Sequence, residues 1–150
     1  MNKEYPLSLK GMFAWMAGSY VDLKSIAGEE GIILWKQRMD KGLSAGYNAQ
    51  GAARGSGVDA FLEHVVKRDH VLGMEAGGHV TNERKFSYWI KDLFYLFKNE
   101  ISETDYQNIS THGYLATKIK YFLTGEWKAT MTKNPWQGHD RTEWIIEKLD

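Results

Sequence analysis

The sequence lacks cysteine, has only two prolines in 150 residues, and has no net charge, because 19 basic side chains balance 19 acidic ones. Without cysteine the chain has no disulfide, no thiolate nucleophile and no cysteine-ligated metal. Without surplus positive charge it does not resemble a general nucleic-acid binder, since phosphate contacts need an excess of Lys and Arg. We therefore expect no nucleic-acid partner.

Long hydrophobic runs are also missing. The longest uninterrupted apolar stretches are short, such as residues 12–17 and 93–97, whereas a transmembrane helix needs about 20 apolar residues. The first ten residues lack a signal-peptide profile, because Lys3 and Glu4 come early. We expect no membrane span and a cytoplasmic location for the chain as it stands. A periplasmic or secreted location would require a signal peptide that has already been removed.

Aromatic side chains are abundant, with six Trp, eight Tyr and six Phe. No linker or internal repeat divides the chain, so we expect one domain over residues 1–150. The aromatics exceed what a core of this size requires. Tyr and Trp combine an apolar body with a polar tip, which suits a ligand cavity or an interface.

Two secondary-structure interpretations compete. In the first, strands dominate. Residues 126–133 alternate, with Trp127, Ala129 and Met131 on one face and polar side chains on the other. Residues 86–97 would form an aromatic hairpin that turns at residues 91–92. The five glycines of residues 42–57 disfavour a stable helix there.

In the second interpretation, amphipathic helices dominate. Phe86, Trp89, Ile90, Leu93 and Phe97 follow a helical spacing, and residues 60–72 do the same. This alternative is a mixed α+β fold with helices around residues 60–72 and 83–101. Near the N-terminus, residues 11–16 fit one short helical turn that ends at Gly18.

Short motifs along residues 13–131 follow an order that a known family shares. Residues 13–20 read Phe-Ala-Trp-Met-Ala-Gly-Ser-Tyr, close to a Phe-x-Trp-Leu-Ala-Gly-x-Trp start. The later motifs are Gly28, Trp35, residues 43–47, Glu63, Phe86, and residues 97–100, 105–109 and 115–119. Together they resemble an uncharacterised bacterial lipocalin-like domain family of the calycin type. Ile33 and Thr104 stand where that family has Glu and His, and Glu100 and Gln107 where it has proline.

The resemblance implies an all-β fold. It implies a single up-and-down antiparallel β-barrel of about eight to ten strands with a short N-terminal helix as a plug. A barrel of this size holds side chains or one small ligand in its interior. The resemblance implies no catalytic activity.

Few side chains suggest catalysis. The histidines form neither His-x-His nor His-Glu-x-x-His, and no Gly-x-Ser-x-Gly motif occurs. We expect no metal and no cofactor. Glu63 is the best candidate for a general base, because its strand neighbours Phe61 and Val65 are apolar and burial would raise its pKa. Asp105 is the second candidate.

We expect non-catalytic binding of a small apolar or aromatic molecule in the barrel cavity. The predicted ligand-binding residues are Trp35, Tyr47, Glu63, Phe86, Tyr88, Phe97, Asn99, Tyr106 and Arg141. A second hypothesis is a barrel enzyme, an isomerase or hydrolase, that uses Glu63 or Asp105 as a general base. A third is a protein-interaction module or homodimer formed through exposed aromatics. We expect a monomer or a homodimer.

Overall fold

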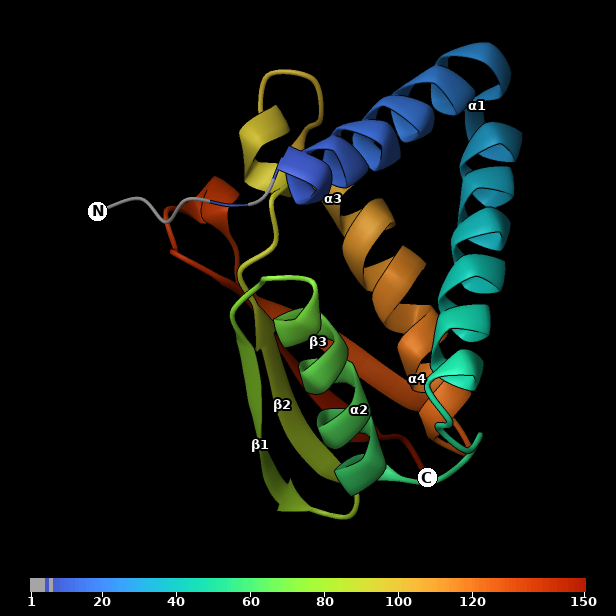
Figure 1. The fold of residues 1–150 in the computed structure, drawn as a ribbon, viewed down its shortest axis with the longest axis vertical. Coiled ribbons are helices and arrows are strands. Elements are labelled where there is room, and N and C mark those ends of the chain that lie inside the picture. Colours follow the sequence, from blue (N-terminus) through green and yellow to red (C-terminus); the bar gives the residue numbers. More distant parts are fainter. Residues whose placement is uncertain (1–4, 6) are drawn as a thin grey trace.

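The computed structural model describes residue 5 and residues 7–150, and it contains long helices beside a small sheet (Figure 1). The helices are α1 (Leu7–Ala49), α2 (Val58–Val71), α3 (Glu103–Ile109) and α4 (Ala116–Phe122). The strands are β1 (Ala76–Asn82), β2 (Lys85–Ile90), β3 (Trp127–Lys133) and β4 (Thr142–Lys148). Two short 3-10 helices, η1 (Phe94–Phe97) and η3 (Pro135–Gln137), and one π-helix, η2 (Ser110–Leu115), complete the fold.

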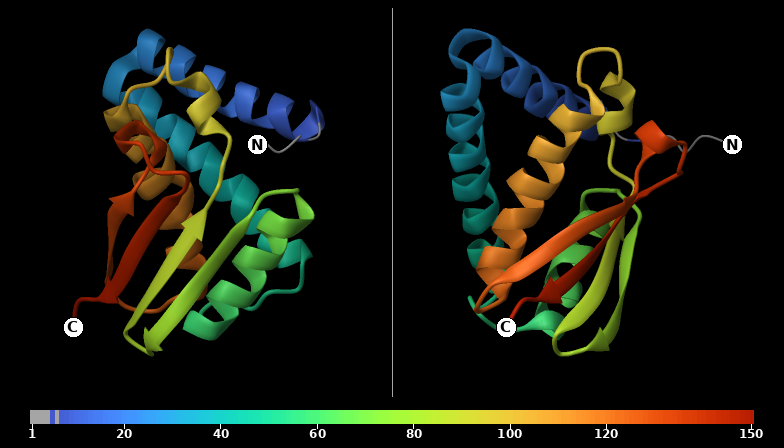
Figure 2. Two further views of the ribbon diagram at one scale, coloured as in Figure 1. Left: turned by 90° about the vertical axis from the view of Figure 1, so that its left-hand side faces the viewer. Right: turned by 180° about the vertical axis from the view of Figure 1, so that it is seen from behind.

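The four strands form one open antiparallel sheet in the order β1-β2-β4-β3. The helices gather on one face of this sheet and leave its other face uncovered (Figure 2). The predicted all-β barrel is therefore wrong, and the mixed α+β alternative fits. Residues 7–49 cannot supply barrel strands because they form α1.

Helix α1 is two arms joined at an elbow. Gly28 has φ 57° and ψ −131°, which interrupts the helix, and an added Cβ at Gly31 would lie 1.9 Å from the Leu23 carbonyl oxygen. Only glycine accommodates both the positive φ and this close approach of the two arms. The predicted helix end at Gly18 was wrong, because the helix runs through it. The expectation that residues 42–57 avoid a helix was wrong up to Ala49.

Helix α2 confirms the amphipathic pattern predicted for residues 60–72. Phe61, Val65 and Asp69 lie on its buried face, while Glu63 and Lys67 are exposed. The spacing of four residues between the buried positions is that of an α-helix. The same pattern places Asp69, an acidic residue, against the core.

The second predicted helix, around residues 83–101, was wrong. This stretch forms β2 and then η1. Phe86, Tyr88 and Ile90 are buried along β2, with a period of two residues. The predicted hairpin turn at residues 91–92 was also wrong, since β2 pairs with β1 and β4. In β3 the predicted alternation is confirmed, with exposed and half-buried residues in strict succession.

The core lies between the sheet and the helices and is largely aromatic. Tyr88 and Trp144 stack with their ring centroids 5.7 Å apart, and Phe61 of α2 packs edge-on against Phe86 and Tyr88. Within the described part of the chain, no helix combines the length and the apolar character needed to cross a bilayer. Although α1 is long, the polar residues along it and its elbow at Gly28 account for this.

Candidate functional site

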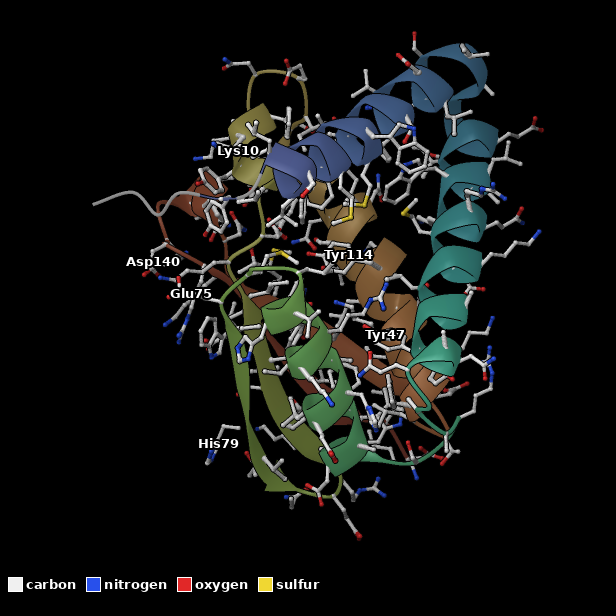
Figure 3. The ribbon with its side chains drawn as sticks, in the orientation of Figure 1. Lys10, Tyr47, Glu75, His79, Tyr114 and Asp140 are labelled. Carbon is white, nitrogen blue, oxygen red and sulfur yellow. The ribbon has the colours of Figure 1, made fainter. Side chains whose placement is uncertain are left out.

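A small cavity lies among α1, α2, the end of β2 and the segment from η2 into α4. Its volume is about 120 Å³. Most of its lining is apolar, and we call it the α1–α2 cavity. The lining residues are Met12, Phe13, Met16, Met39, Leu43, Tyr47, Arg68, Asp69, Leu72, Met74, Ile90, Asp92, Phe94, Tyr114 and Lys118. Tyr47, near the end of α1, and Tyr114, in η2, are labelled in Figure 3. An apolar lining with a few polar groups is typical of a ligand site.

Two lining residues, Lys118 and Asp69, are connected by a buried chain of hydrogen bonds through Tyr88, which lies behind the lining. Lys118 donates a hydrogen bond from Nζ to the Tyr88 hydroxyl at 3.3 Å, and that hydroxyl donates to Asp69 Oδ2 at 2.5 Å. All three residues are buried. The chain connects an amine at the cavity wall to a carboxyl group on α2 through one phenol.

A second buried carboxylate, Asp92, lies just after β2. Its Oδ2 accepts hydrogen bonds from the hydroxyls of Tyr106 and Tyr114, each at 2.6 Å, and its Oδ1 accepts one from the Phe94 backbone N–H at 3.2 Å. Tyr106 also contacts Thr142 Oγ1 at 2.7 Å. Because three donors surround Asp92, it holds η1, α3 and η2 in place at the cavity floor.

Burial shifts the pKa values of these groups toward their neutral forms. It raises the pKa of Asp69 and of Asp92 above the ordinary value, although nearby Lys118 and the tyrosine hydrogen bonds oppose the rise. It lowers the pKa of Lys118, although both carboxylates oppose the fall. Charged forms are disfavoured where water cannot solvate them.

Tyr47 has a hydroxyl group without a partner. It is the one buried side-chain polar atom in the described part of the chain that lacks a hydrogen bond. The residue is fully buried, and burial raises its pKa. The Arg68 guanidinium lies 5.6 Å from its ring centroid. Leaving such a hydroxyl unpaired costs about 1–3 kcal/mol.

The local helix geometry brings Tyr114, Lys118 and Arg68 to the cavity. In η2 the backbone widens to a π-helix, a feature often found at functional sites. Tyr114 precedes Lys118 by four residues, so both lie on the same side of the helix, and the Lys118 Nζ lies 4.7 Å from the Tyr114 ring centroid. On α1, Gly46 has no side chain and Arg68 takes that space, since an added Cβ would lie 2.7 Å from its Nη2.

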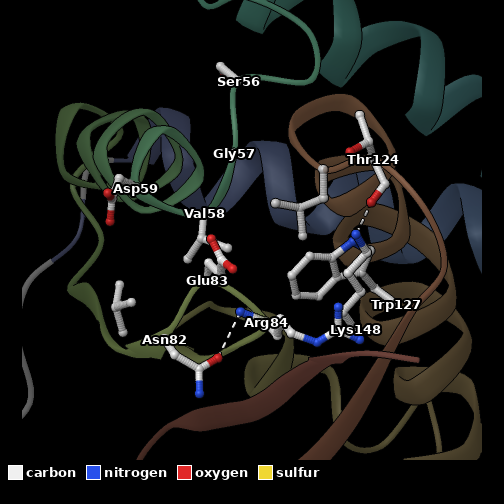
Figure 4. A pocket seen from close by; sticks show the side chains of 12 residues that line it. Ser56, Gly57, Val58, Asp59, Asn82, Glu83, Arg84, Thr124, Trp127 and Lys148 are labelled. Carbon is white, nitrogen blue, oxygen red and sulfur yellow. Dashed lines mark hydrogen bonds between the residues drawn. The ribbon is translucent and has the colours of Figure 1, made fainter. Parts of the chain in front are cut away.

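A larger hollow of about 480 Å³ lies where α2 begins, beside the β1–β2 turn (Figure 4). Its polar lining residues include Asp59, Glu83 and Arg84, all of which are exposed. Trp127 forms part of its wall and donates to the Thr124 carbonyl at 2.9 Å. Exposed polar groups are already solvated, so this hollow lacks the unsatisfied buried group found at the α1–α2 cavity.

Tyr47 alone among the nine predicted ligand-binding residues lines the α1–α2 cavity. Tyr88 and Tyr106 lie behind its wall, in the hydrogen-bonded networks of Asp69 and Asp92. The other six lie elsewhere: Trp35 between the two arms of α1, where it donates to the Met16 carbonyl, Glu63 exposed on α2, Phe86 in the core, Phe97 half-buried on η1, Asn99 exposed, and Arg141 stacked over Trp89 at 4.7 Å.

Neither of the two predicted general bases lines the α1–α2 cavity. Glu63 is exposed on α2, because the helical period turns it away from Phe61 and Val65, which a strand would have placed beside it. Asp105 forms a capping box with Ser102 at the start of α3 and pairs with Lys24 at 2.7 Å. Burial alone would raise the pKa of Asp105, but hydrogen bonds from Lys24, the Ser102 backbone and Tyr20 leave it lowered.

The sequence interpretation missed Asp69, Asp92 and Lys118. For Asp92 the available signal was a charged residue directly before an apolar stretch, residues 93–97. Lys118 follows Tyr114 by one helical turn, which was visible once a helix was assigned there. In the third hypothesis, exposed aromatics form an interface. Trp15 is 60% exposed on α1, and that hypothesis stays a prediction.

The described residues contain no group of three His, Asp or Glu side chains placed to hold a metal ion. Comparison of the sequence with models of known protein families, and with curated proteins, finds no match. The geometry of the cavity is therefore the basis for a functional argument.

Proposed function

We propose that the protein binds a compact molecule with an apolar body and one hydrogen-bonding group in the α1–α2 cavity. The observation that carries this proposal is the unpartnered Tyr47 hydroxyl, buried beside an apolar cavity. Buried polar groups nearly always have a hydrogen-bond partner. A ligand atom at this hydroxyl would supply the missing one.

The size of the cavity limits the ligand. A dry protein cavity of about 150 Å³ accepts benzene, and the α1–α2 cavity has about 120 Å³. A single six-membered ring with a small substituent is therefore near the upper limit. Four methionines, Met12, Met16, Met39 and Met74, line the cavity. Their unbranched side chains adapt to ligands of different shape.

The methionines also provide the test. We suggest titrating methyl-labelled protein with benzyl alcohol and with toluene, which differ by the hydroxyl group, and following the methionine methyl NMR signals. The four cavity methionines should shift, while Met131, on β3 and outside the cavity, serves as an internal control. Benzyl alcohol should bind about tenfold more tightly than toluene, as expected for one added hydrogen bond of about 1.4 kcal/mol.

Two variants sharpen this test. Tyr47→Phe removes the hydroxyl and should abolish the preference for benzyl alcohol, because the ligand hydroxyl then has no partner. Leu72→Phe enlarges a lining side chain and should weaken both ligands. Shifts that spread evenly over all methionines, or a preference for benzyl alcohol that survives in Tyr47→Phe, would contradict the proposed site.

A further inference from the structure

Lys118 presents a buried amine to the α1–α2 cavity. We propose that Lys118 is a reactive lysine, and that it condenses with a small aldehyde or ketone in this cavity to form an imine. The inference rests on the proposed function, because the cavity must first admit a compact ligand. It adds a chemical class, a carbonyl compound, and a covalent step.

The side chains around Lys118 position its nitrogen atom, but none of those described forms an ion pair with it. Its single hydrogen bond to a described residue is the 3.3 Å contact with the Tyr88 hydroxyl, and no described carboxylate oxygen lies within ion-pair distance of Nζ. The Nζ atom lies 4.7 Å from the Tyr114 ring centroid and 5.2 Å from that of Tyr88. A lysine that served only to pair charge would contact a carboxylate directly.

The hydrogen-bonded chain supplies a route for the proton that the amine must lose. An ammonium proton passes from Nζ to the Tyr88 oxygen, while the Tyr88 proton passes to Asp69 Oδ2 across its 2.5 Å hydrogen bond. The result is a neutral amine and a neutral carboxylic acid. Burial favours this neutral pair, since it lowers the pKa of Lys118 and raises that of Asp69.

The chemical step is balanced by groups already present. The Nζ lone pair attacks the carbonyl carbon, and a proton moves from nitrogen to the carbonyl oxygen, giving a carbinolamine. The acid form of Asp69, acting through Tyr88, then protonates the hydroxyl, which leaves as water. The nitrogen loses its remaining proton, and this proton restores the acid. The sum is amine plus carbonyl compound giving imine plus water, with no oxidant or reductant.

The cavity limits which carbonyl compounds can react. The carbonyl carbon must reach the Lys118 nitrogen, and the body of the molecule must lie among the methionines and Phe94, which line the same cavity. A hydrogen bond donated by the Tyr47 hydroxyl to the carbonyl oxygen would polarise the carbonyl group and give that hydroxyl a partner. Benzaldehyde meets these requirements in shape and polarity.

The test is reductive trapping. Wild-type protein at pH 7 is briefly exposed to benzaldehyde and sodium cyanoborohydride, which reduces an imine to a stable amine, and peptide mapping gives the modified fraction at each lysine. An ordinary lysine is a free amine in about one molecule in 2,500 at this pH. Lys118 should therefore be modified at least about tenfold faster than exposed Lys120 on the same helix, which pairs with Asp40 at 3.6 Å.

Variants and one extra measurement separate the possible results. Lys118→Met should abolish the fast modification, and Lys120→Met should leave it unchanged. Tyr47→Phe should slow it without altering the modification of surface lysines. If Lys118 stays unmodified while Lys120 reacts, the reactive-lysine inference is wrong. If benzyl alcohol still binds in the same samples, the proposed function stands. If Lys118 is unmodified and benzyl alcohol does not bind, both the reactive-lysine inference and the proposed function are wrong.

Discussion

Replacing Tyr47 by Phe tests whether its hydroxyl lacks a partner in the free protein. The substitution keeps the ring, which packs 5.1 Å from the Phe122 centroid, and removes only the buried oxygen. An unsatisfied buried hydroxyl costs about 1–3 kcal/mol. We therefore expect Tyr47→Phe to raise the free energy of unfolding by about 1–2 kcal/mol, or about 2–8 °C in Tm for a domain of this length.

Tyr121→Phe is the matched control. Tyr121 is also buried, its ring centroid is 5.6 Å from that of Tyr47, and its hydroxyl donates to the Ala52 carbonyl oxygen at 2.8 Å. The same chemical change there removes a hydrogen bond that exists. We expect Tyr121→Phe to lower the free energy of unfolding by about 1 kcal/mol.

Urea denaturation of the two variants and the wild type, followed by tryptophan fluorescence, measures both effects. Midpoints can be compared directly if the slopes agree. The reasoning is refuted if Tyr47→Phe loses stability to the same extent as Tyr121→Phe. That outcome would show that the Tyr47 hydroxyl has a partner in the free protein, and it would remove the observation that carries the proposed function.

Three further predictions concern the elbow and the titrating groups. Gly28→Ala should lower the free energy of unfolding by about 1–3 kcal/mol because of the positive φ, whereas Gly18→Ala, inside the first arm with open space around it, should raise it by about 0.5–1 kcal/mol. Asp105 has a lowered pKa when folded, so its stabilisation is present above pH 3.8 and is lost as the pH falls below that value. Asp105→Asn should therefore flatten the acid limb of a plot of urea midpoint against pH. Above about pH 10, buried tyrosines with raised pKa keep their protons while the unfolded chain loses them, so the urea midpoint should fall as pH rises. These tyrosines are Tyr47, Tyr88, Tyr106 and Tyr114.

Where one period dominates, the sequence shows it, although the helix over residues 60–72 was predicted only in the alternative α+β interpretation. Residues 127–133 repeat every two residues, and residues 60–72 repeat every three to four. Residues 86–97 satisfy both periods, because nearly every position is aromatic or apolar. The choice between them was made by long-range pairing of β2 with β4, which joins residues about 55 positions apart.

Helix α1 was not predicted because its glycines disfavour a helix locally, whereas tertiary packing favours one. Each glycine in a helix interior costs about 1 kcal/mol, and α1 contains Gly42 and Gly46 in its second arm. Burial of Trp35 and Tyr47 on that arm outweighs this cost. The resemblance to barrel motifs at residues 13–20 and 43–47 carried the error further, since both segments lie within α1.

The site was hidden for a related reason. Assigning residues 61–65 to a strand placed Glu63 beside Phe61 and Val65, and the helix instead buries Asp69. Lys118 stood among other lysines and aromatics, so nothing in its sequence neighbourhood distinguished it from exposed Lys120. Only the three-dimensional arrangement separates the two, because Lys118 lies toward the core and Lys120 toward solvent.

The proposed ligand would account for the unpaired Tyr47 hydroxyl and the sparse hydrogen bonding of Lys118 better than stability does. Burying an ion costs several kcal/mol, and replacing buried ions by apolar side chains of similar size is often neutral or stabilising. Asp92 offsets its cost through three hydrogen bonds and is explained as a structural residue. Lys118 and Tyr47 have unused hydrogen-bonding capacity, and both line the same apolar cavity. A polar group of a bound molecule would gain most by reaching these two side chains.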